Sequence, residues 1–235
     1  MEDFDNDGDD DVLSGSWPGD LYFFQRNDDG KFEAGTKIVD HEGEPISLEK
    51  ASTVFAADWD GDEDLDLLVG DIQGNVQLVL NEGSKDEPKF NAEDATTIDL
   101  GKNRGKKGDS GPVAADWDND GKVDLVVAFG DGSVYWYRNE GSTEKAKLAA
   151  GKQLVGASEF GFDFSKYKPG MWGSRVKVCV TDWDGDGQLD LLLGDRGGEM
   201  IESEKDDKPK KVRHGFVHVF LRKTTGKLAD VADAK

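Results

Sequence analysis

The sequence predicts an all-β protein, a β-propeller of four-stranded antiparallel blades with four repeats present. Three observations predict this fold. An acidic loop of one pattern occurs four times, and its copies are 55, 58 and 66 residues apart, beginning at Asp3, Asp58, Asp116 and Asp182. Short apolar runs flank each loop, and no segment has a helical period. The 30 glycines against 6 prolines indicate many turns.

Each repeat has the same succession of parts. An apolar first strand enters the loop, a second strand leaves it, a third strand alternates in polarity, and a less regular outer segment leads onward. Because such a unit is too small to fold alone, each blade must cover the apolar face of its neighbour. The expected first strands are 53–57, 112–115 and 176–181, the second strands 12–13, 65–69, 125–128 and 189–193, and the third strands 20–25, 75–80, 133–137 and 215–221.

We expect one propeller domain over 1–235, with blades at approximately 1–50, 51–108, 109–173 and 174–235. The first blade lacks its first strand, because only Met1 and Glu2 precede its loop. Either segment 223–235 closes a four-bladed ring, or the chain is a partial ring of a larger propeller. The weakly apolar tail favours the partial ring, and the start inside a loop suggests a piece of a longer protein.

Two insertions and one cysteine stand outside the repeat pattern. The aromatic-rich segment 156–173 is expected either to cap one end of the ring or to form a contact surface. The charged segment 196–214 is interpreted as a solvated hairpin tip. The single cysteine, Cys179, lies in a strand-like run and is expected to be a small core residue.

The acidic loops have the composition of calcium sites. Ca²⁺ takes six to eight oxygen ligands at about 2.3–2.6 Å, and carboxylates alternating around a sharp turn supply them. Positions 1, 3, 5 and 9 are aspartate in every loop, and position 7 would add its backbone carbonyl. The predicted side-chain ligands are Asp3, Asp5, Asp7 and Asp11; Asp58, Asp60, Asp62 and Asp66; Asp116, Asp118, Asp120 and Asp124; and Asp182, Asp184, Asp186 and Asp190, with carbonyls from Asp9, Asp64, Lys122 and Gln188.

The turn position of the loop separates loop 2 from the others. Position 6 is Gly8, Gly121 and Gly187, but Glu63 in loop 2, so loop 2 is expected to be strained or to bind calcium more weakly. An EF-hand is excluded, because it requires a glutamate at position 12 and flanking helices. Zn²⁺ would require histidine or cysteine, and Mg²⁺ prefers to keep its waters. Aspartates so close together would repel one another strongly without a cation.

These residues resemble a known family. The units Ala57 to Asp62 (ADWDGD), Leu67 to Gly70 (LLVG) and Gly132 to Asn139 (GSVYWYRN) are similar to FG-GAP/VCBS repeats, the calcium-binding propeller blades of integrin α-subunits and many secreted bacterial proteins. The resemblance covers nearly the whole chain. It implies one Ca²⁺ in the loop between the first and second strands of each blade, up to four structural ions. It implies no activity, since family members serve in adhesion, in polysaccharide binding and as accessory domains of enzymes.

Charge and motifs exclude several function classes. The net charge of −21 argues against nucleic acid and anionic membranes as partners, because both would be repelled. No apolar stretch reaches the roughly 18 residues of a membrane helix, so no membrane insertion is expected. The histidines His41, His214 and His218 form no recognisable catalytic motif, and His218 is expected at a cross-strand or surface position. The tryptophans at loop position 2 could stack on sugars, but packing between blades is favoured for Trp59, Trp117 and Trp183.

The sequence therefore predicts a calcium-binding, non-enzymatic propeller module that serves as an extracellular binding or adhesion scaffold, as a monomer or as part of a larger chain. Its ligand, a protein or a carbohydrate, is not identified by the sequence. Weak calcium sites need millimolar calcium, which favours an extracytoplasmic location. The alternatives are the propeller of a secreted polysaccharide-active enzyme (lyase, hydrolase or dehydratase), with its active site on face loops or a missing domain, and a structural repeat within a large surface protein.

Overall fold

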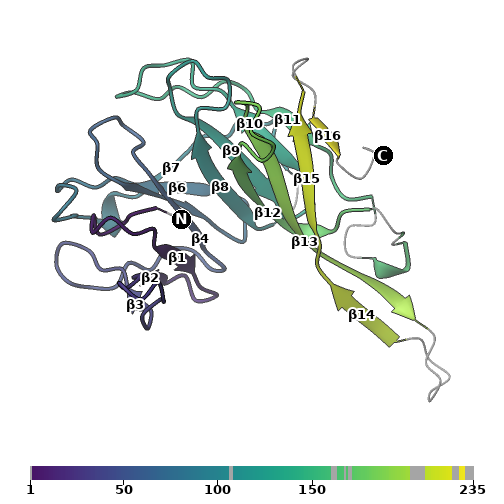
Figure 1. The fold of residues 1–235 in the computed structure, drawn as a ribbon, viewed down its shortest axis with the longest axis horizontal. Helices are drawn as coiled ribbons and strands as arrows, with labels where there is room; N and C mark the ends of the chain where they lie inside the picture. Colours follow the sequence, from purple (N-terminus) through teal and green to yellow (C-terminus); the bar gives the residue numbers. More distant parts are fainter. Residues whose placement is uncertain are drawn as a thin grey trace.

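The computed structural model describes residues 2–105, 108–159, 163–166, 168, 171–201, 210–223 and 228–230. Its strands form four antiparallel sheets arranged as the blades of a four-bladed β-propeller (Figure 1). Helix in this part of the chain is limited to two 3-10 turns, η1 (Ala92–Asp94) and η2 (Phe164–Lys166). No helix among these residues is long and apolar enough to cross a membrane. The predicted all-β propeller is confirmed.

The sheets follow one another along the chain, and each is a meander of neighbouring strands. The first sheet contains β1 (Val12–Gly15), β2 (Leu21–Phe24) and β3 (Thr36–Lys37). The second contains β4 (Thr53–Ala57), β5 (Asp66–Gly70), β6 (Val76–Val79) and β7 (Thr96–Thr97). The third contains β8 (Ser110–Ala115), β9 (Asp124–Phe129), β10 (Val134–Tyr137) and β11 (Lys152–Val155). The fourth contains β12 (Ser174–Thr181), β13 (Asp190–Ile201), β15 (Val217–Arg222) and β16 (Leu228–Asp230), with β14 (Lys210–His214) paired to β13.

The first sheet has three strands, the second and third have four each, and the fourth has five. In place of a first strand, a single bridge joins Glu2 and Asp11. The alternative in which segment 223–235 supplies that strand is wrong for its described part: β16 pairs with β15 and so completes the fourth sheet. Among the residues that the structure describes, no further strand pairs with the edge of β1 that faces the propeller axis.

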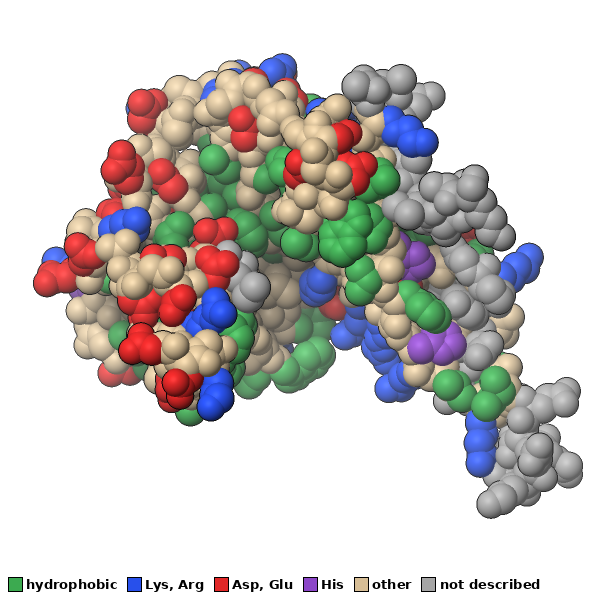
Figure 2. Space-filling model, viewed as in Figure 1, with side chains coloured by type: hydrophobic (Ala, Val, Ile, Leu, Met, Phe, Trp, Pro, Cys, Tyr) green, Lys and Arg blue, Asp and Glu red, His purple; other side chains and the backbone are tan. Residues whose placement is uncertain are grey.

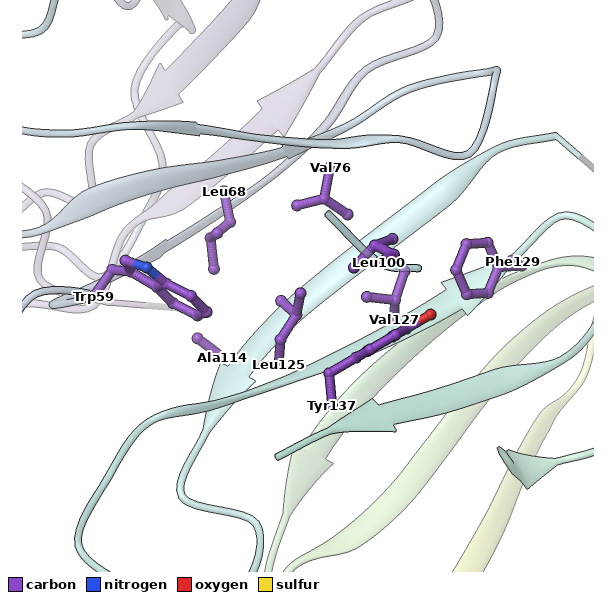
Figure 3. Packing of buried hydrophobic residues seen from close by; sticks show 9 residues of the cluster. All are labelled: Trp59, Leu68, Val76, Leu100, Ala114, Leu125, Val127, Phe129 and Tyr137. Atoms are coloured by element: carbon purple, nitrogen blue, oxygen red, sulfur yellow. The ribbon is translucent and has the colours of Figure 1, made fainter. Parts of the chain in front are cut away.

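The hydrophobic core lies between the sheets. One cluster joins the first and second sheets, a second joins the second and third, and a third joins the third and fourth. Because successive side chains of a strand point to opposite faces, Leu67 and Val69 pack toward the first sheet while Leu68 packs toward the third. Figure 3 shows this second cluster, in which Leu68 points toward the Trp59 ring and Leu125 lies beside them. Among the described residues, no cluster of this kind joins the first sheet to the fourth.

The strands nearest the propeller axis, β1, β4, β8 and β12, line an open cavity of about 290 Å³. Lys177 of β12 is its charged lining residue, and the Lys177 ammonium donates to the carbonyl of Ser110, 3.2 Å away. Small residues such as Gly15, Thr53 and Gly111 line the cavity together with apolar ones such as Leu13 and Phe55.

The insertions differ from what the sequence suggested. In segment 196–214, residues 197–201 pair with 210–214, so the charged excursion is a continuation of β13 into a two-stranded ribbon rather than only a hairpin tip. Its tip, 202–209, lies outside the described residues. In segment 156–173, Trp172 packs edge-on against Phe220 at 6.0 Å between ring centroids, whereas Phe160, Phe162 and Tyr167 lie outside the described residues.

The expectation for Cys179 is wrong. The side chain is exposed rather than in the core. Cys179 pairs with Leu192 of β13 and lies on the face of the fourth sheet opposite to the one that packs on the third sheet. A strand-like apolar run predicts a sheet but cannot say which of its faces another sheet covers.

Candidate metal centres

Each acidic loop brings three carboxylates together, with one oxygen of each within 4.8 Å of the others. Loops 1, 3 and 4 group positions 1, 3 and 9, and loop 2 groups positions 1, 3 and 5. The predicted aspartates at position 5 of loops 1, 3 and 4, and at position 9 of loop 2, lie in the same loops but outside these groups. The groups are Asp3, Asp5 and Asp11; Asp58, Asp60 and Asp62; Asp116, Asp118 and Asp124; and Asp182, Asp184 and Asp190.

The aspartate at position 1 fixes the turn. In loop 4 the carboxylate of Asp182 accepts from the backbone N–H groups of Asp186 (3.1 Å) and Gly187 (2.9 Å). The equivalent bonds, from positions 5 and 6 to position 1, recur in the other three loops. The backbone thus curls around this carboxylate, and its N–H groups are satisfied by the same side chain that faces the group of carboxylates.

Two residues of every loop have left-handed backbone, at positions 4 and 6. Position 4 is asparagine or glycine, and position 6 is glycine except for Glu63, which has φ +74°. A residue with a Cβ atom is disfavoured there by about 1–2 kcal/mol. The predicted strain of loop 2 is therefore present in its backbone, whereas a weaker affinity for calcium stays a prediction.

The aspartate at position 9 is buried and ties the loop to the third strand of its sheet. The carboxylate of Asp66 accepts from the N–H of Trp59 at 2.9 Å and from the N–H of Asn81 at 2.8 Å. Equivalent bonds hold Asp11, Asp124 and Asp190 to the N–H groups of Arg26, Asn139 and Arg222. Burial raises the pKa of Asp66 to about 6, although both hydrogen bonds lower it. The sequence predicted this residue as a ligand but not as a clamp.

In loops 1, 2 and 3, the aspartate at position 3 has an oxygen with no hydrogen-bond partner. The Oδ1 atoms of Asp5, Asp60 and Asp118 are buried from solvent, and no donor reaches them. Burial raises the pKa of Asp5 and of Asp60, and the neighbouring loop carboxylates raise both further. A buried, unpaired carboxylate oxygen is costly unless a cation approaches it. The donor set, hard carboxylate oxygens around a tight turn, fits Ca²⁺ rather than a softer metal.

The residues at positions 5 and 7, both predicted as metal ligands, are joined by a hydrogen bond within the loop. The position-5 carboxylate accepts from the N–H of position 7, as Asp62 does from Asp64 at 3.0 Å and Asp186 from Gln188 at 2.9 Å. These bonds close a second small turn inside the loop. That the carbonyls of Asp9, Asp64, Lys122 and Gln188 contribute ligands stays a prediction.

Two cationic side chains contact the carboxylates of loop 3, and the sequence analysis did not predict these contacts. The guanidinium of Arg138 lies 2.6 Å from Asp118 through Nε and 2.9 Å from Asp120 through Nη2. Lys122 lies 3.2 Å from Asp120. Burial raises the pKa of Asp120, but the hydrogen bonds from Lys122 and Arg138 outweigh it, so the pKa is lowered. Loop 3 is thus partly neutralised by side chains of its own sheet.

The residue just before the one that donates to the position-9 aspartate decides this difference between loops. Arg138 directly precedes Asn139, whose N–H donates to the position-9 aspartate. At the same place, loop 1 has Gln25, whose side-chain amide donates to Asp7 at 3.1 Å. Loops 2 and 4 have the leucines Leu80 and Leu221. A comparison of the repeats at this one position would have revealed the difference in the sequence.

Two of the three position-2 tryptophans pack as predicted. Trp59 and Trp117 are 7% and 3% exposed and belong to the clusters between sheets. The prediction for Trp183 is wrong, because that side chain is 58% exposed. His218 is a cross-strand residue as expected: its Nε2 lies 3.3 Å from the buried carboxylate of Asp195.

The comparison with protein families agrees with this repeat pattern. A model described as an FG-GAP-like repeat matches the chain three times, over residues 3–69, 58–127 and 116–193. Each match begins at the first aspartate of a loop and extends through the next loop into its second strand. A search of curated proteins gives no match. Together the three matches span most of the chain, and the chain belongs to the FG-GAP-like repeat family.

Proposed function

We propose that the protein is a calcium-stabilised, non-enzymatic propeller module that acts as an extracytoplasmic binding scaffold. The observation that carries the calcium proposal is the set of buried Oδ1 atoms of Asp5, Asp60 and Asp118, which have no hydrogen-bond partner and lie within groups of converging carboxylates. Members of the FG-GAP-like family commonly bind calcium in such loops.

The residues that would hold the ion are the aspartates at positions 1, 3, 5 and 9 with the carbonyl at position 7. Calcium would neutralise each group of carboxylates and so connect the first and second strands of a sheet without a disulfide. The position-1 and position-9 aspartates already hold the backbone in the curled conformation through their N–H bonds. The loop is therefore largely preformed for a cation.

A binding rather than a catalytic role is supported by the positions of the acidic side chains, which converge in the four loops. Among the described residues, groups of three or more metal-ligating side chains occur in the four loops and nowhere else. His218 is paired with a structural carboxylate rather than placed beside a nucleophile. Propellers carry binding sites on the loops at the ends of their blades, which suits a scaffold for a protein or carbohydrate ligand.

A calcium titration of the metal-free chain tests the proposal. Isothermal titration calorimetry should show binding to up to four sites per chain, and Mg²⁺ at the same concentration should compete poorly. Absence of binding at millimolar calcium would overturn the calcium proposal. Release of reducing sugar or unsaturated product from a polysaccharide panel by the purified chain would overturn the non-enzymatic assignment.

Replacing Arg138 by leucine, the residue that loops 2 and 4 have at this place, should raise the calcium affinity of loop 3 at least about tenfold. The guanidinium must leave Asp118 and Asp120 before an ion can use both carboxylates, and hydrogen bonds between charged partners such as these are stronger than neutral ones. Tryptophan fluorescence reports on this loop through Trp117, and calorimetry counts the added tight site.

A matched control is Lys152→Leu. It removes one positive charge from the same sheet, but the Lys152 ammonium lies over the Trp136 ring at 5.4 Å rather than on a loop carboxylate. It should leave the affinity of loop 3 almost unchanged. Equal gains in the two variants would mean that only net charge matters and that the contact of Arg138 does not.

A further inference from the structure

The contact between the first and second sheets contains an open pocket of about 280 Å³. Its aromatic wall consists of Phe4 of loop 1, Phe23 of β2 and Phe90, which bridges to Asn81 beyond β6. The Phe4 ring stacks on the Phe90 ring with 6.2 Å between centroids and tilts against the Phe23 ring at 5.3 Å. Phe90 is buried, whereas Phe4 and Phe23 are only partly buried. The pocket therefore has aromatic surface that a small molecule can reach.

One residue of the repeat accounts for this space. Position 2 of the loop is Phe4 in loop 1 but Trp59 in loop 2. Trp59 is 7% exposed, and in the next contact it packs with the side chains that stand at the places of the pocket walls. These are Leu78, Ile98, Ala146 and Leu148, which correspond to Phe23, Ile38, Pro88 and Phe90. Because a phenyl ring is smaller than an indole, Phe4 leaves open the space that Trp59 fills to the usual density of a protein interior.

Two hydrogen bonds hold the pocket walls together across the two sheets. The backbone N–H of His41 donates to the carbonyl of Phe90 at 2.9 Å. The side-chain amide of Asn6 donates to Oδ1 of Asp86 at 2.7 Å. Both bonds join the first repeat to the segment that follows β6. The pocket is thus preformed, as binding pockets for small molecules usually are.

The rim of the pocket has both acceptors and a donor of hydrogen bonds. Asp40 is fixed through its Oδ1 atom, which accepts from the N–H groups of Glu42 (2.9 Å) and Glu44 (3.0 Å). Asp86 is likewise held through Oδ1. No hydrogen bond from the described residues reaches Oδ2 of either carboxylate, and within the same part of the chain the Lys85 ammonium has no ion-pair partner. The two Oδ2 atoms and the ammonium are therefore available to a ligand.

Charged side chains of both signs line the pocket. Its lining residues include three aspartates and two lysines, namely Asp5, Asp40, Asp86, Lys37 and Lys85. Figure 2 shows acidic and basic side chains next to one another over the part of the molecule that holds the first sheet. A charged ligand would meet a like charge here whatever its sign. An apolar ligand would cover the carboxylates without offering them a hydrogen-bond donor.

A neutral molecule with hydroxyl groups suits both parts of the pocket. A hydroxyl donates to a carboxylate and accepts from an ammonium, so it pairs with either kind of group at the rim. A sugar ring also has a face of C–H groups, which can lie against the face of an aromatic ring. At about 280 Å³ the pocket lies just below the roughly 300–1,000 Å³ of drug-sized binding cavities, so it holds about one ring.

We propose that this pocket binds a neutral sugar residue of a glycan. The sugar ring lies against Phe4 and Phe23, and its hydroxyls bond to the rim carboxylates and to the Lys85 ammonium. The inference rests on the binding function proposed above, and it names the ligand class and the site. The pocket lies where two repeats meet and shares one residue with a candidate metal centre, because Asp5 also belongs to the carboxylate group of loop 1.

Saturation-transfer-difference NMR of the whole chain in calcium tests the proposal. The probes are the methyl glycosides of glucose, galactose and mannose, and at least one of them should bind with a dissociation constant on the order of 1 mM. Glucuronate and glucosamine, in which the ring carries a negative or a positive charge, should bind more weakly than the neutral probe. N-acetylleucinamide, an apolar peptide probe, should not bind.

Two variants and a control locate the site. Phe4→Trp puts into loop 1 the residue that the other loops have, so it should abolish sugar binding without lowering the melting temperature or changing calcium binding. Lys85→Ala changes an exposed residue and should weaken sugar binding about tenfold at an unchanged melting temperature. Lys89→Ala is the matched control: it removes the same charge from the same segment, but Lys89 does not line the pocket, so the affinity should stay the same.

Several outcomes would overturn the proposal. Absence of transfer to every neutral glycoside, or full binding by Phe4→Trp, excludes the pocket as a sugar site. Equal losses in Lys85→Ala and Lys89→Ala exclude the proposed contact, and stronger binding of a charged ring or of the peptide probe excludes the ligand class. The calcium titration is a separate measurement: a chain that binds calcium but no sugar overturns only this inference, and one that binds sugar but no calcium overturns only the calcium proposal.

Discussion

Removal of calcium with excess EDTA at pH 7 should lower the melting temperature by at least about 15 °C. A site filled to a hundred times its dissociation constant contributes about 2.7 kcal/mol to the free energy of unfolding. Three or four such loops contribute together, and each kilocalorie shifts the midpoint of a chain this long by about 2–4 °C. Differential scanning calorimetry in millimolar calcium and in EDTA measures the shift, and an unchanged melt would contradict the structural role of the ion.

The pH dependence of the chelated protein gives an independent check. Burial raises the pKa of Asp66 to about 6 and raises that of Asp124, so in the absence of metal these carboxyls stabilise the folded state when protonated. This contribution is fully present below the unfolded pKa near 4 and is lost as the pH rises through about 6. In EDTA the melting temperature should therefore be higher at pH 5 than at pH 7. In calcium the order should reverse, because protons compete with the ion.

The parts of the fold that the sequence predicted are those that depend on neighbours along the chain. The four loops, the strands on either side of them and the glycine positions follow from local steric and hydrogen-bonding rules, which act within about nine residues. Glu63 illustrates the same point, since its left-handed backbone, φ +74°, was predicted from one missing glycine. The repetition of the unit then predicted the propeller, because the apolar face of each unit must be covered by a neighbouring unit.

The errors and omissions concern contacts between distant residues. Trp183 was assigned to the core from its position in the loop and Cys179 from its strand-like apolar run, but neither pattern says whether another sheet covers the residue. The contact of Arg138 with loop 3 joins residues 18 and 20 positions apart, across the end of a strand. The clamp at position 9 likewise depends on the third strand returning beside the loop. The direction of a side chain at these positions depends on strands that are distant in the sequence and come together only in the folded sheet.

Replacing Asp66 by alanine should destabilise the protein in calcium by about 3 kcal/mol. Asp66 is 1% exposed, and its two oxygens accept the N–H groups of Trp59 and Asn81. Without them two backbone donors are buried unpaired, and each costs about 1–3 kcal/mol. Loop 2 also loses a predicted ligand. Urea unfolding monitored by tryptophan fluorescence measures the loss, because Trp59 donates one of the broken bonds.

Asp64→Ala is the matched control, because it removes the same charge from the same loop while the proposed contribution of Asp64, a backbone carbonyl, is kept. It should cost well under 1 kcal/mol. Repeating both measurements in EDTA separates the two roles of Asp66. The Asp66→Ala cost should shrink there, since a buried carboxylate without a cation is itself unfavourable, as its raised pKa indicates. A cost that stays the same in EDTA and calcium would mean that Asp66 acts only as a clamp, and that the ion, where it binds, is held by the other carboxylates of the loop.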